Sequence, residues 1–184
     1  MGAANRWKAL RLVPWANSAL ADGRAAEVEA KARSVMAAHA DAGLTAEPCL
    51  TAWECLAAAL AQLGHHAAAM DEYTRLIDAG PAARTTDRRV TQWQANRGGQ
   101  LAYLARYDEA EADSRAVIES CQRVLPTSLV AMLRSSAVNN LRFVLSERGL
   151  HAEAEAAARQ AIREANSTVD ARFWPDRAAA WQRA

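Results

Sequence analysis

A short sequence pattern recurs four times along this chain. It begins at Gly23, Gly64, Ala105 and Gly149, so that successive starts lie 41, 41 and 44 residues apart. In every copy the sixth residue is small or slim, and the thirteenth and fourteenth are apolar. These apolar pairs are Val35-Met36, Leu76-Ile77, Val117-Ile118 and Ala161-Ile162. A unit of two helices cannot bury such a ridge alone and must stack against its neighbours, so the spacing predicts an all-α array of helical repeats.

The repeats are expected to form one elongated domain over residues 1–184. We place them at approximately 7–41, 48–80, 86–124 and 127–166, followed by a C-terminal capping helix at 170–184. Each repeat consists of a first helix, a tight turn at the Gly or Ala, and a second helix. The second helices are predicted at about 66–78, 108–124 and 152–164. A polar joint at Asn166 and Ser167 would precede the cap, whose Trp174 and Trp181 would cover the apolar end of the last repeat.

The second helices share a pattern of charge. A Glu precedes an Arg by four residues at the same position in three repeats: Glu29 and Arg33, Glu111 and Arg115, Glu155 and Arg159. Residues four apart are neighbours on a helix surface, so these pairs indicate an exposed outer stripe. The second repeat departs from the pattern, and its pair is expected to be Asp71 with Arg75.

Composition excludes several classes of partner. The 22 basic and 21 acidic residues give a net charge of +1, whereas nucleic acids and anionic membranes attract proteins with an excess of positive charge. The first 15 residues contain no uninterrupted apolar stretch of signal-peptide length, and no apolar run approaches the roughly 18 residues of a membrane span. Cys49, Cys55 and Cys121 suit buried thiols in a reducing compartment. We therefore expect a cytoplasmic protein with no nucleic-acid or membrane partner.

Motifs for metal binding or catalysis are not apparent in the sequence. His65 and His66 could be combined with His39, Cys49 or Cys55 as metal ligands, but no HxxxH or CxxC spacing supports such a site. No nucleophile elbow or phosphate-binding loop frames any Ser, His or Asp. The expectation is a protein that is not an enzyme and that needs neither a metal nor a cofactor. The six tryptophans are expected to lie mostly in the core, with Trp53 and Trp93 packing between neighbouring first helices.

Four segments resemble the tetratricopeptide repeat family. ARYDEAEADSRAVI (105–118) and GLHAEAEAAARQAI (149–162) are similar to its second helix, and LAAALAQLG before the second turn and NNLRFVLSERG before the fourth are similar to its first helix. The unit is longer than the usual period of about 34 residues and looks like the long-period, kinesin-light-chain-like bacterial type. The resemblance implies a right-handed superhelical solenoid of antiparallel helix pairs, with a concave face lined by first-helix residues.

The same resemblance implies a peptide-binding groove on that concave face. Carried over position by position, its residues are Glu54, Ala58, Gln62, Gly99, Tyr103, Asn139, Phe143 and Glu147. Asn96 and Asn140 adjoin these positions and are included in the expected groove. An Asn there offers a donor and an acceptor to the backbone of an extended partner, although it also serves to bridge repeats. Relatives that clamp a C-terminal carboxylate use Lys and Arg, whereas Glu54 and Glu147 occupy this face. A neutral or basic partner segment is therefore favoured.

The expected function is a protein–protein interaction adaptor that binds a peptide segment or helix of a partner protein. Two alternatives stay open at this stage. The groove could bind a short signalling peptide or small ligand in a regulatory or sensory module. Alternatively, the chain could associate with itself into a homodimer as a structural protein.

Overall fold

The computed structural model describes residues 12–43, 45–123 and 127–173, and these residues form α-helices and one short 3-10 helix, without a strand. The helices of the described part are α2 (Leu12–Ala21), α3 (Ala25–Ala38), η1 (Ala40–Ala42), α4 (Glu47–Gln62), α5 (His66–Ala79), α6 (Asp87–Tyr103), α7 (Tyr107–Gln122), α8 (Ser128–Glu147) and α9 (His151–Phe173). The predicted all-α class is confirmed for this part of the chain. None of these helices is both long and apolar enough to span a membrane.

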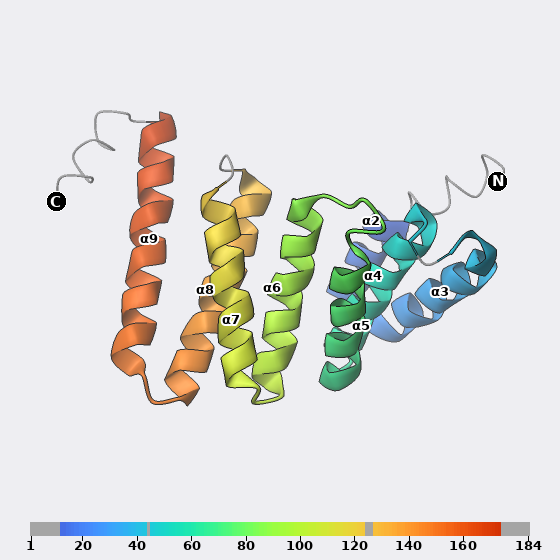
Figure 1. Cartoon of the computed structure of the whole chain (residues 1–184), viewed down its shortest axis with the longest axis horizontal. Coiled ribbons are helices and arrows are strands. Elements are labelled where there is room, and N and C mark those ends of the chain that lie inside the picture. The colour runs from blue at the N-terminus through green and yellow to red at the C-terminus, as the bar shows by residue number, and fades with distance from the viewer. Residues whose placement is uncertain (1–11, 44, 124–126, 174–184) are drawn as a thin grey trace.

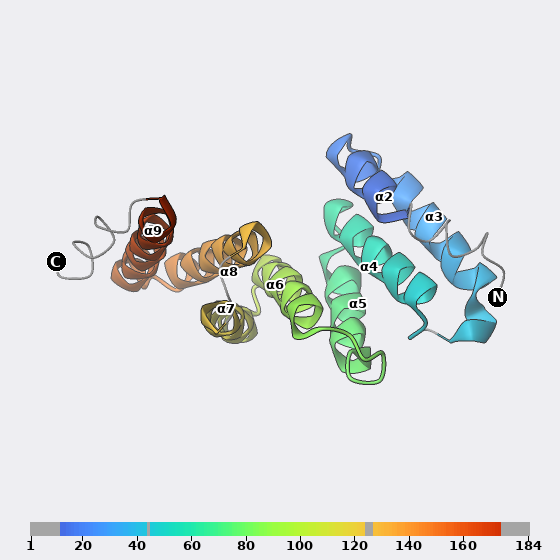
Figure 2. The same cartoon turned by 90° about the horizontal axis from the view of Figure 1, so that it is seen from above.

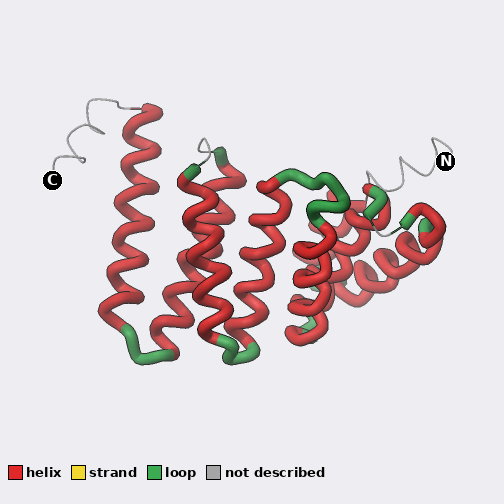
Figure 3. The backbone as a smooth tube through the Cα atoms, viewed as in Figure 1, coloured by secondary structure: helices red, strands yellow, loops and turns green. Residues whose placement is uncertain are grey.

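Helices α3 to α9 follow one another along a row, and α2 packs against both α3 and α4 at the N-terminal end of this row (Figure 1). We call the first helices of the repeats, α2, α4, α6 and α8, the A-helices, and α3, α5, α7 and α9 the B-helices. Short loops join most neighbours, and the longest described one leads from α5 to α6 (Figure 3). Seen from above, α6 and α8 lie along one side of the row, and α7 lies on the other (Figure 2).

The turn within each repeat explains why glycine recurs in the sequence. Gly23, Gly64 and Gly149 have φ values of 75°, 78° and 75°, in the left-handed region that ends many helices. The N–H after each turn then donates to a carbonyl in the last turn of the A-helix, as from His65 to Leu60 at 2.9 Å. Ala105 adopts the same conformation with a φ of 57°, although a Cβ atom makes it unfavourable.

The predicted core positions of the repeats are buried. The sixth residues of the four repeats, Val28, Ala69, Ala110 and Ala154, expose between 0 and 3% of their surface. The two tryptophans Trp53 and Trp93 are buried in one cluster with residues of α4 and α5, as expected. All three cysteines are buried and free, and burial raises the pKa of each thiol.

The A-helices are not evenly spaced. Helix α6 packs closely on α8 through small residues, since Ala95 and Ala102 are buried there and Gly99 faces Asn140. Between α4 and α6, in contrast, the backbones hardly approach each other. The indole of Trp93 lies in this space with Tyr73 of α5, and side chains of this size keep the two helices apart. The row therefore opens between α4 and α6.

Three sequence predictions are corrected by the structure. Helix α9 continues through Asn166 and Ser167 to Phe173, so the polar joint does not end the helix. Asn and Ser have lower helix propensities than Ala but do not break a helix as Pro does. Arg75 pairs with Glu72 at 3.4 Å rather than with Asp71, because residues three apart also share a helix face. Ile162, expected in the apolar ridge, is 60% exposed, and no described helix follows α9 to cover it.

Several predictions concern residues that are not described. Trp7, Trp174 and Trp181 lie outside the described residues, as does the predicted cap except for its first positions, 170–173, which belong to α9. In the first repeat, α2 begins at Leu12 and has Pro14 in its first turn, where a missing N–H is tolerated. The three predicted Glu to Arg pairs are present, with distances of 2.9, 2.7 and 2.6 Å.

Candidate functional site

A groove of about 600 Å³ occupies the opening between α4 and α6. Its walls come from α2, α4 and α6, from the α5–α6 loop, and from Leu129 at the start of α8. In Figure 2, α2 and α4 lie on one side of this opening and α6 and α8 on the other. The groove thus lies on the face of the A-helices, and its size falls within the roughly 300–1,000 Å³ that is typical of ligand clefts.

An ion pair spans the groove and links its two walls. Arg89 of α6 donates from Nε to Oε1 of Glu54 at 2.6 Å and from Nη2 to Oε2 at 2.7 Å. Its Nη1 donates to Glu47 at 2.9 Å. Burial lowers the pKa of Arg89, but Glu54 and Glu47 together raise it by more, so that the pKa lies above its ordinary value. The charge of Glu54 is therefore compensated within the chain and is not free to attract a basic partner.

Aromatic side chains form the floor beneath this ion pair. Trp93 donates from Nε1 to Oε1 of Glu54 at 2.5 Å, and the guanidinium of Arg89 lies 5.7 Å from the centre of the Trp93 ring. Tyr73 is 3% exposed, and burial raises the pKa of its phenol above the ordinary value, while a hydrogen bond with Asn96 lowers it. The floor is consequently rigid, because each polar atom named here has a partner within the chain.

The structure brings three of the sequence-derived residues together in the groove: Glu54, Ala58 and Asn96. Two others have a structural role. Gln62 donates to the carbonyl of Leu20 at 2.7 Å and joins α4 to α2. Asn140 donates to the carbonyl of Ala95 at 3.1 Å and joins α8 to α6.

The remaining predicted residues lie outside the groove walls. Gly99 faces the Asn140 side chain at the α6–α8 contact. Tyr103 stacks on His66, with ring centres 4.4 Å apart, and is still 69% exposed. Glu147 accepts a hydrogen bond of 3.4 Å from Tyr107. Asn139 and Phe143 are exposed on α8.

Sequence reasoning missed the residue that organises the site, Arg89. It lies 35 residues from Glu54 in the sequence, and no local pattern links the two positions. Gln92 and Thr51 also line the groove and were not predicted. Gln92 could have been found, since it precedes Asn96 by four residues on the same face of α6.

A second, smaller cavity of about 290 Å³ lies between α7, α8 and α9 and contains none of the predicted site residues. Within the part of the chain that the structure describes, no three His, Cys, Asp or Glu side chains are grouped as metal ligands. Comparison with protein-family models, with curated proteins and with solved structures found no match to this chain.

Proposed function

We propose that this protein is a non-enzymatic adaptor that binds a peptide segment of a partner protein on the face of its A-helices. The observation that carries the proposal is the groove between α4 and α6, which is formed by three A-helices and held open by Trp93 and the Glu54–Arg89 pair. The proposal includes a tetratricopeptide-like, right-handed array and a cytoplasmic location, where a reducing environment keeps the three buried thiols free.

The groove has the mixed character that peptide recognition needs. Val13, Leu20 and Leu129 offer apolar contacts, while Asn17 and Gln92 offer amide groups. An amide side chain can donate to and accept from a peptide backbone at the same time. The walls also come from separate helices, so that a bound segment would contact several repeats at once.

Site-specific photo-crosslinking in the native cytoplasm tests the proposal. A photoreactive amino acid is introduced at Gln92, which is exposed in the groove, and at Ala112, which is exposed on α7 outside it. A protein crosslinked from position 92 and not from position 112 would support the adaptor. The identified segment should then bind as a synthetic peptide.

A blocking variant provides the matched control. Ala58→Arg places a long charged side chain into the groove from α4, and Ala112→Arg adds the same side chain on the surface of α7. We expect Ala58→Arg alone to weaken binding of the peptide by about tenfold or more, which corresponds to about 1.4 kcal/mol. Equal binding by both variants would refute the groove, and a crosslink to a second copy of the chain would favour self-association instead.

A further inference from the structure

Helices α2, α4 and α6 carry few charges that a partner could use, whereas α8 has the exposed residues Arg142 and Glu147. Helix α2 has no charged side chain, and the two on α4, Glu47 and Glu54, both bind Arg89. Between Val90 and Tyr103, the single charged residue of α6 is Arg97, and it forms two hydrogen bonds of 2.8 and 2.7 Å with Asp113 of α7. The ionic groups in the middle of this face therefore neutralise one another.

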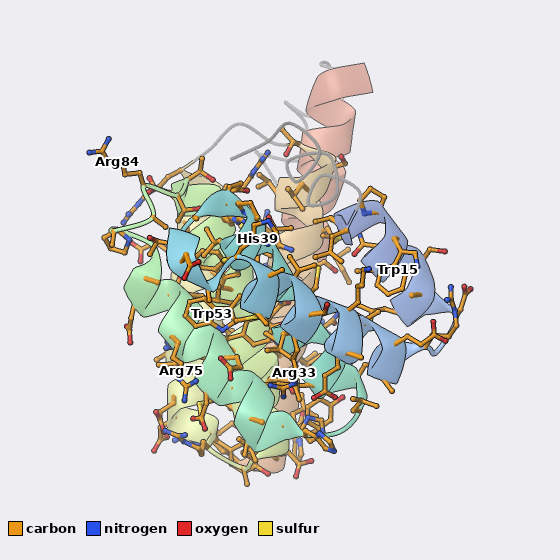
Figure 4. The ribbon with its side chains drawn as sticks, turned by 90° about the vertical axis from the view of Figure 1, so that its right-hand side faces the viewer. Trp15, Arg33, His39, Trp53, Arg75 and Arg84 are labelled. Atoms are coloured by element: carbon orange, nitrogen blue, oxygen red, sulfur yellow. The ribbon has the colours of Figure 1, made fainter. Side chains whose placement is uncertain are left out.

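The B-helices present the opposite surface. Ion pairs follow one another on their exposed sides, including Glu29 with Arg33 on α3, Glu72 with Arg75 on α5, and Glu111 with Arg115 on α7. Arg33 and Arg75 lie on the outer surface in Figure 4, while Trp53 lies between the helices. The difference in charge between the two faces thus recurs along the array, because each repeat contributes one A-helix and one B-helix.

Exposed apolar side chains occur on the weakly charged face. Four of the large exposed hydrophobic residues in the described part belong to A-helices: Val13, Tyr103, Met132 and Phe143. On α8, Leu129, Met132, Ser136, Asn139 and Phe143 follow one another at intervals of three or four residues and share one side of the helix. Leu129 lines the groove, so this stripe continues the groove along α8.

We infer that the segment bound on this face is uncharged and carries apolar side chains. The centres of protein interfaces are depleted of charge and enriched in aromatic residues and Met, as this face is. A charged segment would lose water of hydration here and would find Glu54, Arg89 and Arg97 already paired within the chain. The inference rests on the proposed function and specifies the chemistry of its partner.

Three exposed arginines provide the strongest argument for a charged ligand, since Arg84 and Arg88 line the groove and Arg142 is exposed on α8. Arg84 extends away from the helices into solvent (Figure 4). Arg88 is exposed in the first turn of α6. None of these three arginines has an ion pair among those found in the described part of the chain. An acidic ligand that uses Arg88 is accordingly the outcome that would overturn the inference.

Selection from a library of random peptides tests the chemistry directly. Peptides of about 12 residues span roughly 40 Å when extended and can reach from the groove to α8. They are selected on the full chain, and those that also bind the Ala58→Arg variant are discarded. We expect the retained peptides to be enriched in apolar residues and poor in Asp, Glu, Lys and Arg. Their Kd should change less than about twofold between roughly 50 and 500 mM NaCl, since salt screens only ionic contacts.

A pair of opposite substitutions at Gln92 gives a second readout. Gln92→Glu and Gln92→Lys should both weaken the binding of an uncharged peptide by similar factors, because the introduced charge must be desolvated when the peptide binds. Ser34→Glu and Ser34→Lys, on the exposed surface of α3, serve as controls and should leave peptide binding unchanged. Selected acidic peptides that bind Gln92→Lys more tightly, or basic ones that prefer Gln92→Glu, would overturn the inference and leave the proposed function standing. If no selected peptide depends on Ala58, the proposed function itself fails.

Discussion

Glu54 on α4 and Arg89 on α6 are joined by two parallel hydrogen bonds across the widest gap between neighbouring A-helices. Their side chains are 24% and 21% exposed, so that the pair is only partly screened by water. The guanidinium also contacts Glu47 and Trp93, and one residue of α6 thereby holds the α4 wall of the groove in place. The groove is open because Trp93 keeps α4 and α6 apart. Its shape is fixed because Arg89 links the two helices.

Removing the Glu54 carboxylate should therefore destabilise the protein. Glu54→Ala leaves the Trp93 N–H without its acceptor and Arg89 with Glu47 as its one remaining carboxylate partner, which should lower the free energy of unfolding by about 1–3 kcal/mol. Urea-induced unfolding followed by tryptophan fluorescence measures the change. The control is Glu119→Ala, which breaks an exposed pair with Arg123 and should cost less than about 0.5 kcal/mol. Equal effects of the two variants would contradict this role.

Replacement of Ala105 by glycine should stabilise the protein. Ala105 adopts a φ of 57°, a conformation that glycine reaches without strain, so Ala105→Gly should raise the free energy of unfolding by about 0.5–1 kcal/mol. The reverse change at an equivalent turn, Gly64→Ala, should lower it by about 1 kcal/mol. Thermal unfolding of both variants, compared with wild type, shows whether the first is stabilised and the second destabilised. A loss of stability in Ala105→Gly would count against the prediction.

Adjacent glycines on α6 should respond differently to substitution. A Cβ atom on Gly98 would lie 3.3 Å from Cβ of Asp113, and Gly98→Val should destabilise the α6–α7 contact by about 1–3 kcal/mol. A Cβ atom on Gly99 would meet Asn140 at an ordinary distance of 3.6 Å. Gly99→Ala should thus stabilise α6 by about 0.5–1 kcal/mol through its helix propensity. Similar unfolding midpoints for the two variants in urea would show that α6 and α7 are less closely packed than described.

Substitution of two neighbouring asparagines on α8 should distinguish a residue needed for stability from one needed for peptide binding. Asn140→Ala removes the hydrogen bond to the carbonyl of Ala95 and should cost about 1 kcal/mol of stability. Asn139 is exposed, so Asn139→Ala should change stability by less than about 0.5 kcal/mol. If the stripe on α8 contacts the partner, Asn139→Ala should instead weaken binding of the selected peptides. Chemical unfolding and peptide titration of both variants distinguish the roles.

Buried thiols should make the folded protein less stable at high pH. Burial raises the pKa of Cys55 from 9.0 to about 11, so between these values the unfolded thiol ionises and the folded one does not. The unfolded state is then favoured, and the free energy of unfolding should fall as pH rises from about 9 to about 11. Burial raises the pKa of Tyr73 as well, which adds to the loss above pH 10. Unfolding at pH 8 and pH 10, with a Cys55→Ser control, measures the effect.

Thiol labelling gives an independent check of the same burial. At pH 8 the thiols of Cys49, Cys55 and Cys121 should react slowly in the native protein and rapidly in denaturant, because thiolate is the reactive form. Fast labelling of any of the three in the native state would show that its helix opens locally.

The sequence by itself determined the repeat, because its signals are local. Gly23, Gly64 and Gly149 end helices through their own backbone freedom, and the Glu to Arg pairs need only the four-residue spacing of one helix. The approximate bounds of α5 and α7 and the buried sixth residues of the repeats followed from the same periodicity, whereas the end of α9 did not. The groove residues Glu54, Ala58 and Asn96 came instead from the resemblance to tetratricopeptide repeats. It did not show that Gln62 and Asn140 bind carbonyl groups of other helices, since those acceptors are 42 and 45 residues away.

The location of the groove was decided by the tertiary structure alone. Helices α6 and α8 come close because Ala95, Gly99 and Ala102 are small, while α4 and α6 stay apart because Trp93 lies between them. Which of these residues face one another depends on how whole helices pack, and periodicity within one helix carries no information about it. The same holds for Arg89, whose charge compensates Glu54 only after α4 and α6 are assembled in the row.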